Sequence, residues 1–542
     1  MRRTKPGEKA FPGLTAPLLA ILVAFFLVVS GNYAFYRSLL AVYPLAWRSA
    51  PFLASVSFVL FCLTALFLLA FGWRRTLKPL LILVLLVSSV TSYFMNTYNV
   101  VIDVQMLRNV LQTDPAETMD LLSPRMAGYF LFLGLLPAAW VTRARVRLRP
   151  WNIEARSRLK YAAALLLALP AVAIAFSGNY YSFLREHKLV RSYANPAAWI
   201  FSTGRLAFGS AKAKAVRPVG EDAAIPATDT DRELIILVVG EAVRADKLSL
   251  NGYAKETNPL LAREDVVSFT SFYSCGTTTS FSVPCMFSVF GRKDYSEGKA
   301  RETENLLDVL RHAGVNVLWR DNNSNSKGVA ERVTYEDYKS PGKNPLCDTE
   351  CRDEGMLGGL QDYIDRTEAG DIFIVLHQMG NHGPAYYKRY PGRFERFAPV
   401  CRSNQLEQCT GEEIENAYAN AVLYTDYFLS RVIGLLKANS KDFHTAMVYV
   451  SDHGESLGEN RVYLHGLPYF VAPDEQKHVA AVMWFGDSFG VDRKALRAIS
   501  GLRFSHDNLF HTVLGMMEIR TAVYKKDLDI LNFDRSLAGV RR

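Results

Sequence analysis

The chain has 542 residues, of which 49% are hydrophobic and 21% are charged, and its formal net charge is +9. Residues 1–217 hold 25 Lys and Arg against 7 Asp and Glu, whereas the remaining residues hold 37 against 46. The basic surplus therefore belongs to a hydrophobic first part and not to the acidic second part, which excludes nucleic acid as the expected partner.

Five apolar segments in the first part are about as long as a helix must be to cross the hydrocarbon core of a membrane, which takes about 20 residues. The shorter ones could each be a buried core helix, but five in series favour membrane spans. We therefore predict an N-terminal transmembrane domain over residues 1–176. The predicted spans are Leu14–Phe35, Pro51–Trp73, Leu77–Tyr93, Met126–Val141 and Tyr161–Phe176.

Basic residues mark the orientation of these spans. They precede the first span, lie between the second and third, and fill the loop of residues 143–160 before the fifth. Because Lys and Arg are retained in cytoplasmic loops, the N-terminus is predicted to be cytoplasmic and the chain beyond Phe176 to lie outside. The first span is too long for a removed signal peptide and lacks a small-residue cleavage site, so we expect a retained anchor.

Cysteine usage also indicates that the chain beyond Phe176 lies outside the cytoplasm. Cys62 lies within a span, whereas the other six cysteines follow residue 270 in three close pairs. Such pairs are typical of disulfides in an oxidising compartment. The alternative for the second pair is a zinc site, although no second Cys or His pair follows at zinc-finger spacing. The pairs are Cys275 and Cys285, Cys347 and Cys351, and Cys401 and Cys409.

Residues 177–231 begin with mixed aromatic and basic residues, which predicts interfacial helices, and Ala211 to Asp231 reads as a linker. In residues 232–542, apolar runs alternate with helical patterns. Runs without polar alternation are typical of strands buried on both faces, so we predict an exported α/β domain with a mostly parallel sheet. The predicted strands are Leu234–Gly240, Val315–Trp319, Asp371–His377, Thr445–Ser451 and His478–Gly486.

Polar side chains follow three of these strands. Glu241 follows the first, His382 lies just after the third, and Asp452 and His453 follow the fourth, with His465 in a nearby loop. Open α/β sheets place their sites beyond the carboxyl ends of the strands. Each residue alone has a structural explanation, such as a helix cap for Glu241. Together they favour a metal site, because carboxylates and imidazoles are ligands that zinc accepts.

The segment SCGTTTSFSVPCMFS, Ser274 to Ser288, sets four consecutive hydroxyl side chains between two cysteines. Either this loop is only a stiff turn, or one hydroxyl carries out chemistry. A hydroxyl bound to a metal would have a lowered pKa and become a nucleophile near neutral pH.

Five motifs together make the chain similar to a known family. It closely resembles the lipid A phosphoethanolamine transferases of the alkaline phosphatase and sulfatase superfamily, which include the mobile colistin-resistance enzymes, over essentially its whole length. The motifs are VVGEAVRADKLSLNGY at Val238 to Tyr253, the hydroxyl segment itself, NHGP at Asn381 to Pro384, SDHGESLGE at Ser451 to Glu459 and YLHGLPY at Tyr463 to Tyr469.

The resemblance implies a site built from particular residues. Thr279 would be the nucleophile, although Thr278 and Ser280 beside it leave open which oxygen reacts. One zinc ion would be firmly bound, and a second during turnover is an open alternative. The implied zinc ligands are Glu241, Asp452, His453 and the Thr279 oxygen, the groups implied to contact the phosphoryl group or a second zinc are His382 and His465, and the implied substrate-binding lysine is Lys327.

The resemblance also implies a membrane-side contact. Asn109, Thr113 and Glu117 are spaced four residues apart and so share one helical face. In the family this face contacts the ethanolamine head group. The alternative is an amphipathic interfacial helix that binds no ligand.

The implied activity is transfer of phosphoethanolamine from phosphatidylethanolamine to a phosphate of lipid A through a covalent phosphothreonine, which gives polymyxin resistance. We expect a monomer in the bacterial inner membrane with a periplasmic catalytic domain. Three alternatives fit less well. A sulfatase would need Arg where Met286 stands, the cysteine pairs and motifs argue against a glycerol-phosphate polymerase, and a non-catalytic lipid receptor would not need an intact site. A related transferase that acts on another cell-envelope glycan stays open.

Overall fold

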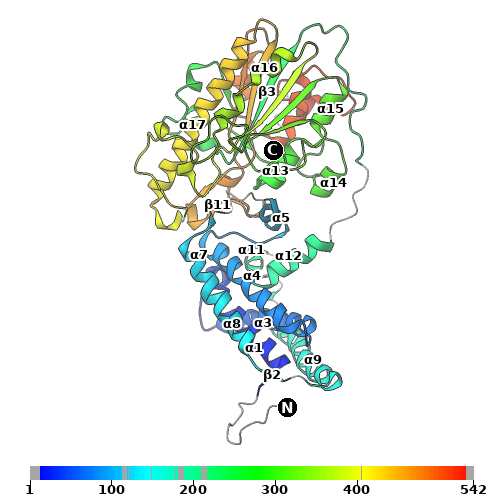
Figure 1. Ribbon diagram of the computed structural model, residues 1–542, viewed down its shortest axis with the longest axis vertical. Helices are drawn as coiled ribbons and strands as arrows, with labels where there is room; N and C mark the ends of the chain where they lie inside the picture. Colours follow the sequence, from blue (N-terminus) through cyan, green and yellow to red (C-terminus); the bar gives the residue numbers. More distant parts are fainter. Residues whose placement is uncertain are drawn as a thin grey trace, which may run out of the picture. The chain divides into compact units, whose positions relative to one another are not determined.

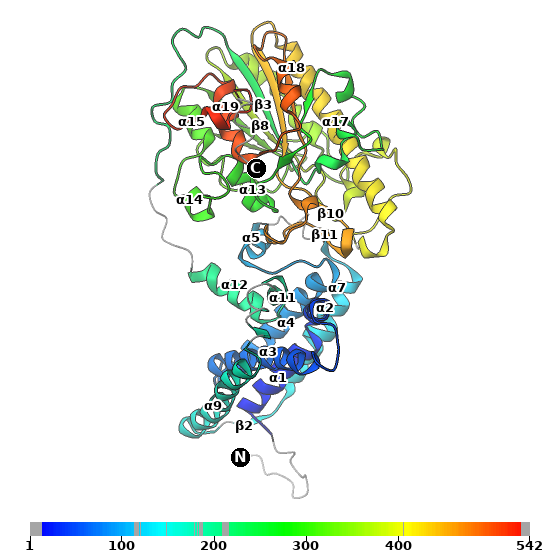
Figure 2. The same cartoon turned by 180° about the vertical axis from the view of Figure 1, so that it is seen from behind.

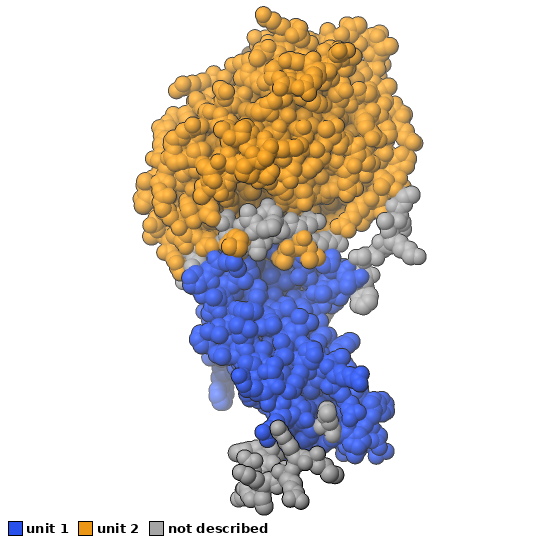
Figure 3. Space-filling model, viewed as in Figure 1, with its two compact units in different colours: residues 1–107, 122–210 blue, residues 108–121, 211–542 orange. Residues whose placement is uncertain are grey.

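The computed structural model describes residues 13–532, except residues 113–118, 120, 148, 178, 181–182, 184–187, 209–215 and 405. The chain forms two compact units (Figure 3). One consists of residues 1–107 and 122–210 and is helical, and the other consists of residues 108–121 and 211–542 and contains the main sheet.

The helical unit has four helices that are long and apolar enough to cross a membrane, counted over the described residues. The pair α1 (Ala16–Ser30) and α2 (Tyr33–Val42) is bent by 57° and makes a fifth span if it counts as one. The sequence predicted one unbroken span here. At the break, the Leu27 carbonyl accepts both the backbone amide of Gly31 and the side-chain amide of Asn32, and Asn32 thereby caps the end of α1. The four helices are α3 (Ala50–Phe71), α4 (Leu77–Thr97), the run of α7 (Pro124–Tyr129), η1 (Phe130–Leu135) and α8 (Leu136–Arg143), and α9 (Trp151–Ala175).

Helix α9 begins well before the predicted start of the fifth span at Tyr161, so three of the basic residues assigned to a loop, Arg156, Arg158 and Lys160, lie in its first turns. Arg158 explains the early start. Its guanidinium pairs with Glu154 at 2.9 Å, donates to the Leu69 carbonyl at 2.6 Å and lies over the Trp73 ring. These contacts bury the charged turn and extend the helix.

Shorter helices and strands lie between these long helices and after them. They are β1 (Leu14–Thr15), α5 (Val104–Gln112), β2 (Val146–Arg147), α11 (Lys188–Ser192) and α12 (Ala197–Phe208).

The described part of the predicted linker, residues 216–231, packs on the second unit, where Val219 and Ala223 are buried in the core.

The second unit is built on a seven-stranded sheet of order β4-β12-β9-β3-β8-β6-β7. All five predicted strands are present, but the sheet is mixed, because β12 is antiparallel to both β9 and β4. Residues 452–480, between β9 and β12, contain no α-helix that could carry the chain back across the sheet. The chain therefore enters β12 at the edge where β9 ends, and the two strands run antiparallel. The strands are β3 (Glu233–Gly240), β4 (Val267–Ser268), β6 (Asn316–Asp321), β7 (Thr334–Asp337), β8 (Ile372–His377), β9 (His444–Ser451) and β12 (Ala481–Phe485).

Helices cover both faces of this sheet (Figures 1 and 2). Alternate residues of β3, such as Leu237 and Val238, enter two separate hydrophobic cores, which is why the strand reads as an unbroken apolar run. The helices are α13 (Thr279–Met286), α14 (Glu297–Arg301), α15 (Leu306–His312), α18 (Arg493–Ile499) and α19 (Leu509–Met516) on one side, and α16 (Leu360–Arg366) and α17 (Gly411–Ala438) on the other.

The three predicted cysteine pairs are confirmed as disulfides, and Cys62 is a buried free cysteine. The zinc alternative for Cys347 and Cys351 is therefore wrong.

Two small two-stranded pairings complete the unit. They join β5 (Phe272–Tyr273) with β13 (Phe504–Ser505), and β10 (Ser456–Leu457) with β11 (Tyr463–Leu464).

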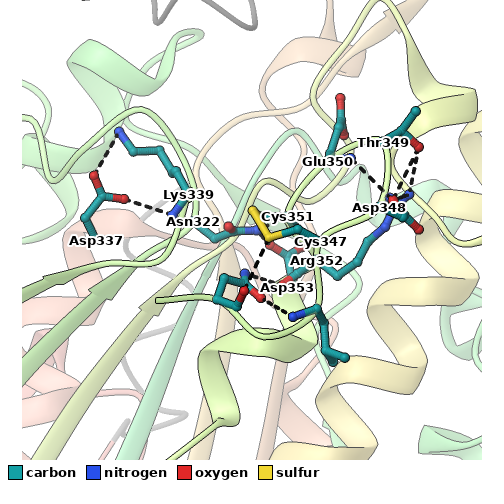
Figure 4. Close-up of a disulfide and its surroundings, with 12 residues drawn as sticks. Asn322, Asp337, Lys339, Cys347, Asp348, Thr349, Glu350, Cys351, Arg352 and Asp353 are labelled. Atoms are coloured by element: carbon teal, nitrogen blue, oxygen red, sulfur yellow. Dashed lines mark hydrogen bonds and ion pairs between the residues drawn. A yellow bond between two sulfur atoms is a disulfide. The ribbon is translucent and has the colours of Figure 1, made fainter. Parts of the chain in front are cut away.

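The disulfide of Cys351 lies beside a buried polar network (Figure 4). Asn322, just beyond β6, donates to the Cys351 carbonyl at 2.9 Å and to the Asp353 carboxylate at 2.8 Å. Asp353 in turn accepts the amides of Met379 and Gly380, just beyond β8. The network therefore joins the loops that follow two neighbouring strands and fixes the loop that carries His382.

Candidate active site and metal centre

Four predicted side chains meet at the carboxyl edge of the parallel strands. Glu241 follows β3, Asp452 and His453 follow β9, and Thr279 is the first residue of α13. The Thr279 hydroxyl lies 3.1 Å from Glu241 Oε2 and 3.3 Å from His453 Nε2. His453 Nε2 lies 3.1 Å from Glu241 Oε1 and 3.5 Å from Asp452 Oδ2. The structure thus brings together residues that are more than 200 positions apart in the chain.

The donor set of this cluster fits a metal ion. One atom each of Glu241, Asp452 and His453 lies within 4.8 Å of the others, and all three residues are fully buried. Asp452 Oδ2 has no hydrogen-bond partner among the described residues, and Glu241 Oε1 is faced only by His453 Nε2. Buried carboxylate oxygens without partners are costly unless a cation faces them. Two carboxylates and one imidazole are ligands that zinc accepts.

The orientation of the His453 ring supports this fit. His453 Nδ1 lies 2.8 Å from the Gly454 carbonyl, to which it donates, so Nε2 is the nitrogen that faces Glu241 and Asp452. Burial lowers the pKa of His453, but the charges of Asp452 and Glu241 outweigh it and raise the pKa to about 10. Without a metal, the cluster therefore holds a proton where a cation would otherwise lie.

The loop before α13 presents its hydroxyls in different directions. Thr279 reaches the cluster, whereas the Thr277 hydroxyl donates to the Leu467 carbonyl at 2.7 Å. Thr278 occupies the N-cap position of α13, and its hydroxyl lies 3.4 Å from that of Ser280. Because a helix N-terminus favours negative charge, the place of Thr279 also suits an anionic ligand.

The two other predicted histidines lie beside the cluster. The rings of His453 and His465 are 4.1 Å apart, and those of His465 and His382 are 5.7 Å apart. Glu455 lies 3.3 Å from His465 Nδ1 and orients that ring. Lys327 donates to the Ser324 carbonyl at 2.8 Å and, with Ser280, lines a cavity of about 400 Å³. The backbone of Asn109 belongs to α5, but its side chain lies outside the described part of the chain, as do Thr113 and Glu117.

Two residues of the site were not predicted. Asn323, just after β6, donates to Glu241 Oε2 at 2.8 Å and to the Gln378 carbonyl at 2.7 Å, and so orients the carboxylate. His506 Nδ1 accepts the Cys275 amide at 3.0 Å, and its Nε2 lies 3.0 Å from the Ser451 carbonyl. Asn323 could have been predicted, because it follows the end of a strand of the main sheet, as Glu241 and Asp452 do. His506 lies in a short 3₁₀ turn outside that sheet, and nothing in the sequence pattern distinguishes it.

Two family models match the chain. The model for the phosphoethanolamine transferases EptA and EptB matches residues 60–210, and the sulfatase model matches residues 233–519. The chain is 43% identical over 525 residues to phosphatidylethanolamine transferase Mcr-1 of Escherichia coli, covering 94% of this chain and 96% of that protein. It is 40% identical over 539 residues to phosphoethanolamine transferase EptA of Salmonella typhimurium, covering 96% and 97%. The chain belongs to the phosphoethanolamine transferase family.

A solved structure extends the likeness to the whole transferase chain. The integral membrane protein lipooligosaccharide phosphoethanolamine transferase A from Neisseria meningitidis superposes with a TM-score of 0.91 at 36% identity, covering 96% of this chain and 99% of that one. The soluble domain of that enzyme covers 59% of this chain at 41% identity, with a TM-score of 0.57. The family resemblance and the combination of membrane helices with a sulfatase-like domain are therefore confirmed.

Replacing His506 of this transferase by alanine is expected to lower kcat by about 10- to 100-fold, as loss of a group that orients metal ligands typically does. His506 is 1% exposed, and burial lowers its pKa to about 3, so it acts as a neutral bridge. Its loss breaks the bonds to the Cys275 amide and the Ser451 carbonyl. This releases the loop of the predicted nucleophile Thr279, the nucleophile loop, from the residue that precedes Asp452. Steady-state kinetics with phosphatidylethanolamine checks this.

His511 supplies the matched control. It is 2% exposed and accepts the Lys525 amide at 3.2 Å, so His511→Ala also removes a buried imidazole and leaves a backbone amide unpaired. It has no bond to the nucleophile loop or to β9 among the described residues. We expect a lower unfolding temperature with unchanged kcat. Equal kcat losses in the two variants would assign His506 to stability alone.

Proposed function

We propose that this chain transfers phosphoethanolamine from phosphatidylethanolamine to a phosphate of lipid A through a covalent ester on Thr279. The observation that carries the proposal is the Thr279 hydroxyl within 3.3 Å of a buried carboxylate and a buried imidazole, at the carboxyl edge of the sheet. Relatives that match over nearly the whole chain are transferases of phosphatidylethanolamine or phosphoethanolamine by name. Lipid substrates also account for a catalytic domain attached to membrane helices.

In the first step, Thr279 Oγ1 attacks the phosphorus of the donor in line with the leaving oxygen. The Thr279 proton passes to Glu241 Oε2, the carboxylate oxygen to which the hydroxyl donates. The Oγ1–P bond forms, the P–O bond to diacylglycerol breaks, and the leaving oxygen takes a proton. Zinc, held by Glu241, Asp452, His453 and Thr279, would lower the pKa of the hydroxyl and offset negative charge that develops on the phosphoryl oxygens.

In the second step, a phosphate oxygen of lipid A attacks the same phosphorus. The Oγ1–P bond breaks, Thr279 regains its proton, and phosphoethanolamine remains on the acceptor phosphate. His382 and His465, next to the cluster, would hold non-bridging oxygens and give the leaving diacylglycerol its proton in the first step. Lys327, in the cavity beside Ser280, would bind the transferred phosphate.

The remaining expectations concern the membrane. We propose that Asn109, Thr113 and Glu117 contact the ethanolamine head group, that the N-terminus is cytoplasmic and that a monomeric enzyme works with its catalytic domain in the periplasm. An added ethanolamine brings a positive charge to lipid A. Since polymyxins are cationic, the product should bind them less and confer resistance.

Mass spectrometry of lipid A tests the reaction. Cells that express the chain should carry lipid A with an added phosphoethanolamine on a phosphate, and cells with Thr279→Ala should not. Polymyxin resistance should follow the added mass. If lipid A is unmodified and another envelope glycan carries phosphoethanolamine, the proposed acceptor is wrong but the transferase activity stands. If no group is transferred at all, the proposed activity is wrong.

A further inference from the structure

A second group of acidic residues lies at the opposite edge of the sheet from the active site. Glu233 opens β3, eight residues before Glu241, which places it about 26 Å away along the strand. Asp229, Glu233 and Glu518 each bring one carboxylate oxygen to within 4.8 Å of the others. Asp371, just before β8, accepts the Glu233 amide at 3.1 Å and adds a fourth carboxylate.

Two of these carboxyl groups, Glu233 and Asp371, are buried and face each other, so they can pair only by sharing a proton. Glu233 and Asp371 are each 3% exposed, and Glu233 Oε2 and Asp371 Oδ2 have no hydrogen-bond partner among the described residues. Asp229 Oδ2 is likewise buried and without a partner in the described part of the chain. Removing charged oxygens from water without replacing their hydrogen bonds is costly, so these groups need a cation or protons.

The protein itself supplies little positive charge here. Over the described residues, the one basic group within 4.0 Å of the Glu233 carboxylate is His444, whose Nδ1 lies 3.8 Å from Oε1. The guanidinium of Arg232 instead donates to the carbonyls of Thr367 and Gly370 and lies over the Phe443 ring. Burial and the charge of Asp371 raise the pKa of Glu233 to about 8, so the carboxyl keeps a proton near neutral pH unless a cation replaces it.

We propose that Asp229, Glu233 and Glu518 bind a hard divalent cation, Ca²⁺ or Mg²⁺, that is separate from the metal of the active site. Oxygen-only ligand sets suit these ions, whereas zinc prefers nitrogen and sulfur among its ligands. A cavity of about 430 Å³ lined by Glu233, His444, Glu518 and Asn532 gives the ion an entry path and room for the water ligands that both ions retain.

The three ligands come from different parts of the chain. Asp229 belongs to the segment that enters the unit, Glu233 to the central strand β3, and Glu518 to the turn after α19. Ala224 and Arg520 already pair by a short backbone bridge beside this place. A bound cation would therefore fasten the entry segment to the C-terminal part, and its contribution is stability and not catalysis.

The test uses the full chain in detergent after metal removal with a chelator, titrated with calcium chloride or magnesium chloride alone. We expect up to about 10 mM of either ion to raise the unfolding temperature by about 2–4 °C, with one ion bound per chain by equilibrium dialysis. The double variant Asp229→Asn, Glu518→Gln should lose the shift and the bound ion. Glu233→Gln should also lose both.

Two control variants separate this site from others. Glu368→Gln removes an exposed carboxylate and should keep the full shift. Asp452→Asn should also keep it, because Asp452 lies at the other edge of the sheet. No shift in wild type with either ion, or an equal shift in the double variant, would overturn the proposal. Neither outcome bears on the proposed transfer reaction, which is measured at Thr279.

Discussion

Replacing Thr279 by alanine is expected to slow phosphoethanolamine transfer by about 10⁴-fold or more, because the variant lacks the oxygen that we propose attacks phosphorus. The side chain is 4% exposed and contacts Glu241 and His453 through that one oxygen. Alanine at the first position of α13 favours the helix, so the fold should persist. The other three proposed metal ligands remain, so the metal content should persist as well. Single-turnover kinetics with a fluorescent phosphatidylethanolamine and intact-protein mass spectrometry measure the two effects.

Thr278→Ala and Ser280→Ala are the matched controls, since each removes one hydroxyl from the same loop. Neither oxygen has a bond to Glu241 or His453 among the described residues, so we expect rates within about tenfold of wild type. Thr278 stands at the N-cap position but makes no side-chain capping bond, so its variant should change the free energy of unfolding by less than about 0.5 kcal/mol. A phosphoethanolamine adduct on Thr278 or Ser280 in the Thr279→Ala protein would show that the nucleophile has been assigned wrongly.

The strands could be predicted because their burial on both faces determines their amino-acid composition. β3 is buried along its whole length, and a strand buried on both faces needs apolar residues at every position. The direction of β12 was not predictable in the same way. It depends on the absence of a crossover helix between Asp452 and Ala480, in a stretch whose short turns and 3₁₀ segments carry no strong periodic pattern.

The helix boundaries in the membrane part failed for a different reason. Hydropathy marks apolar length, so it joined α1 and α2 across Asn32 and began the last span after Arg158. Both residues are buried and polar, with partners far away in the chain, Asn195 for one and Leu69 for the other. Such partners compensate polar groups at membrane depth, and a single sequence does not reveal them.

The site residues that directly follow strands could be grouped from the sequence. Glu241, Asp452 and His453 follow parallel strands, and the rule that ligands bind at the carboxyl edge was enough to group them. Thr279 came from the hydroxyl run and the family resemblance. Asn323 and His506 act by orienting other groups, and a residue that only orients has no chemical type that sets it apart in a sequence.

Replacing Asp452 by asparagine is expected to abolish tight zinc binding and, with it, transfer. Asp452 Oδ1 accepts the amides of Ala242 and His453, at 3.2 and 2.7 Å, and asparagine keeps an oxygen for both. The substitution therefore changes mainly Oδ2, the buried oxygen that has no partner among the described residues. We expect zinc affinity to fall by more than the 10- to 100-fold that loss of an outer-shell group costs.

The sign of the stability change distinguishes a metal site from a structural carboxylate. Without metal, wild type keeps two buried carboxylates against one imidazolium, and the variant keeps one, so metal-free Asp452→Asn should unfold at a higher temperature than metal-free wild type. Zinc should raise the unfolding temperature of wild type and not of the variant. Glu455→Gln, a fully buried carboxylate beside His465, should keep the zinc response. A metal-free variant less stable than metal-free wild type, with zinc bound equally by both, would mean that Asp452 serves the fold and not the ion.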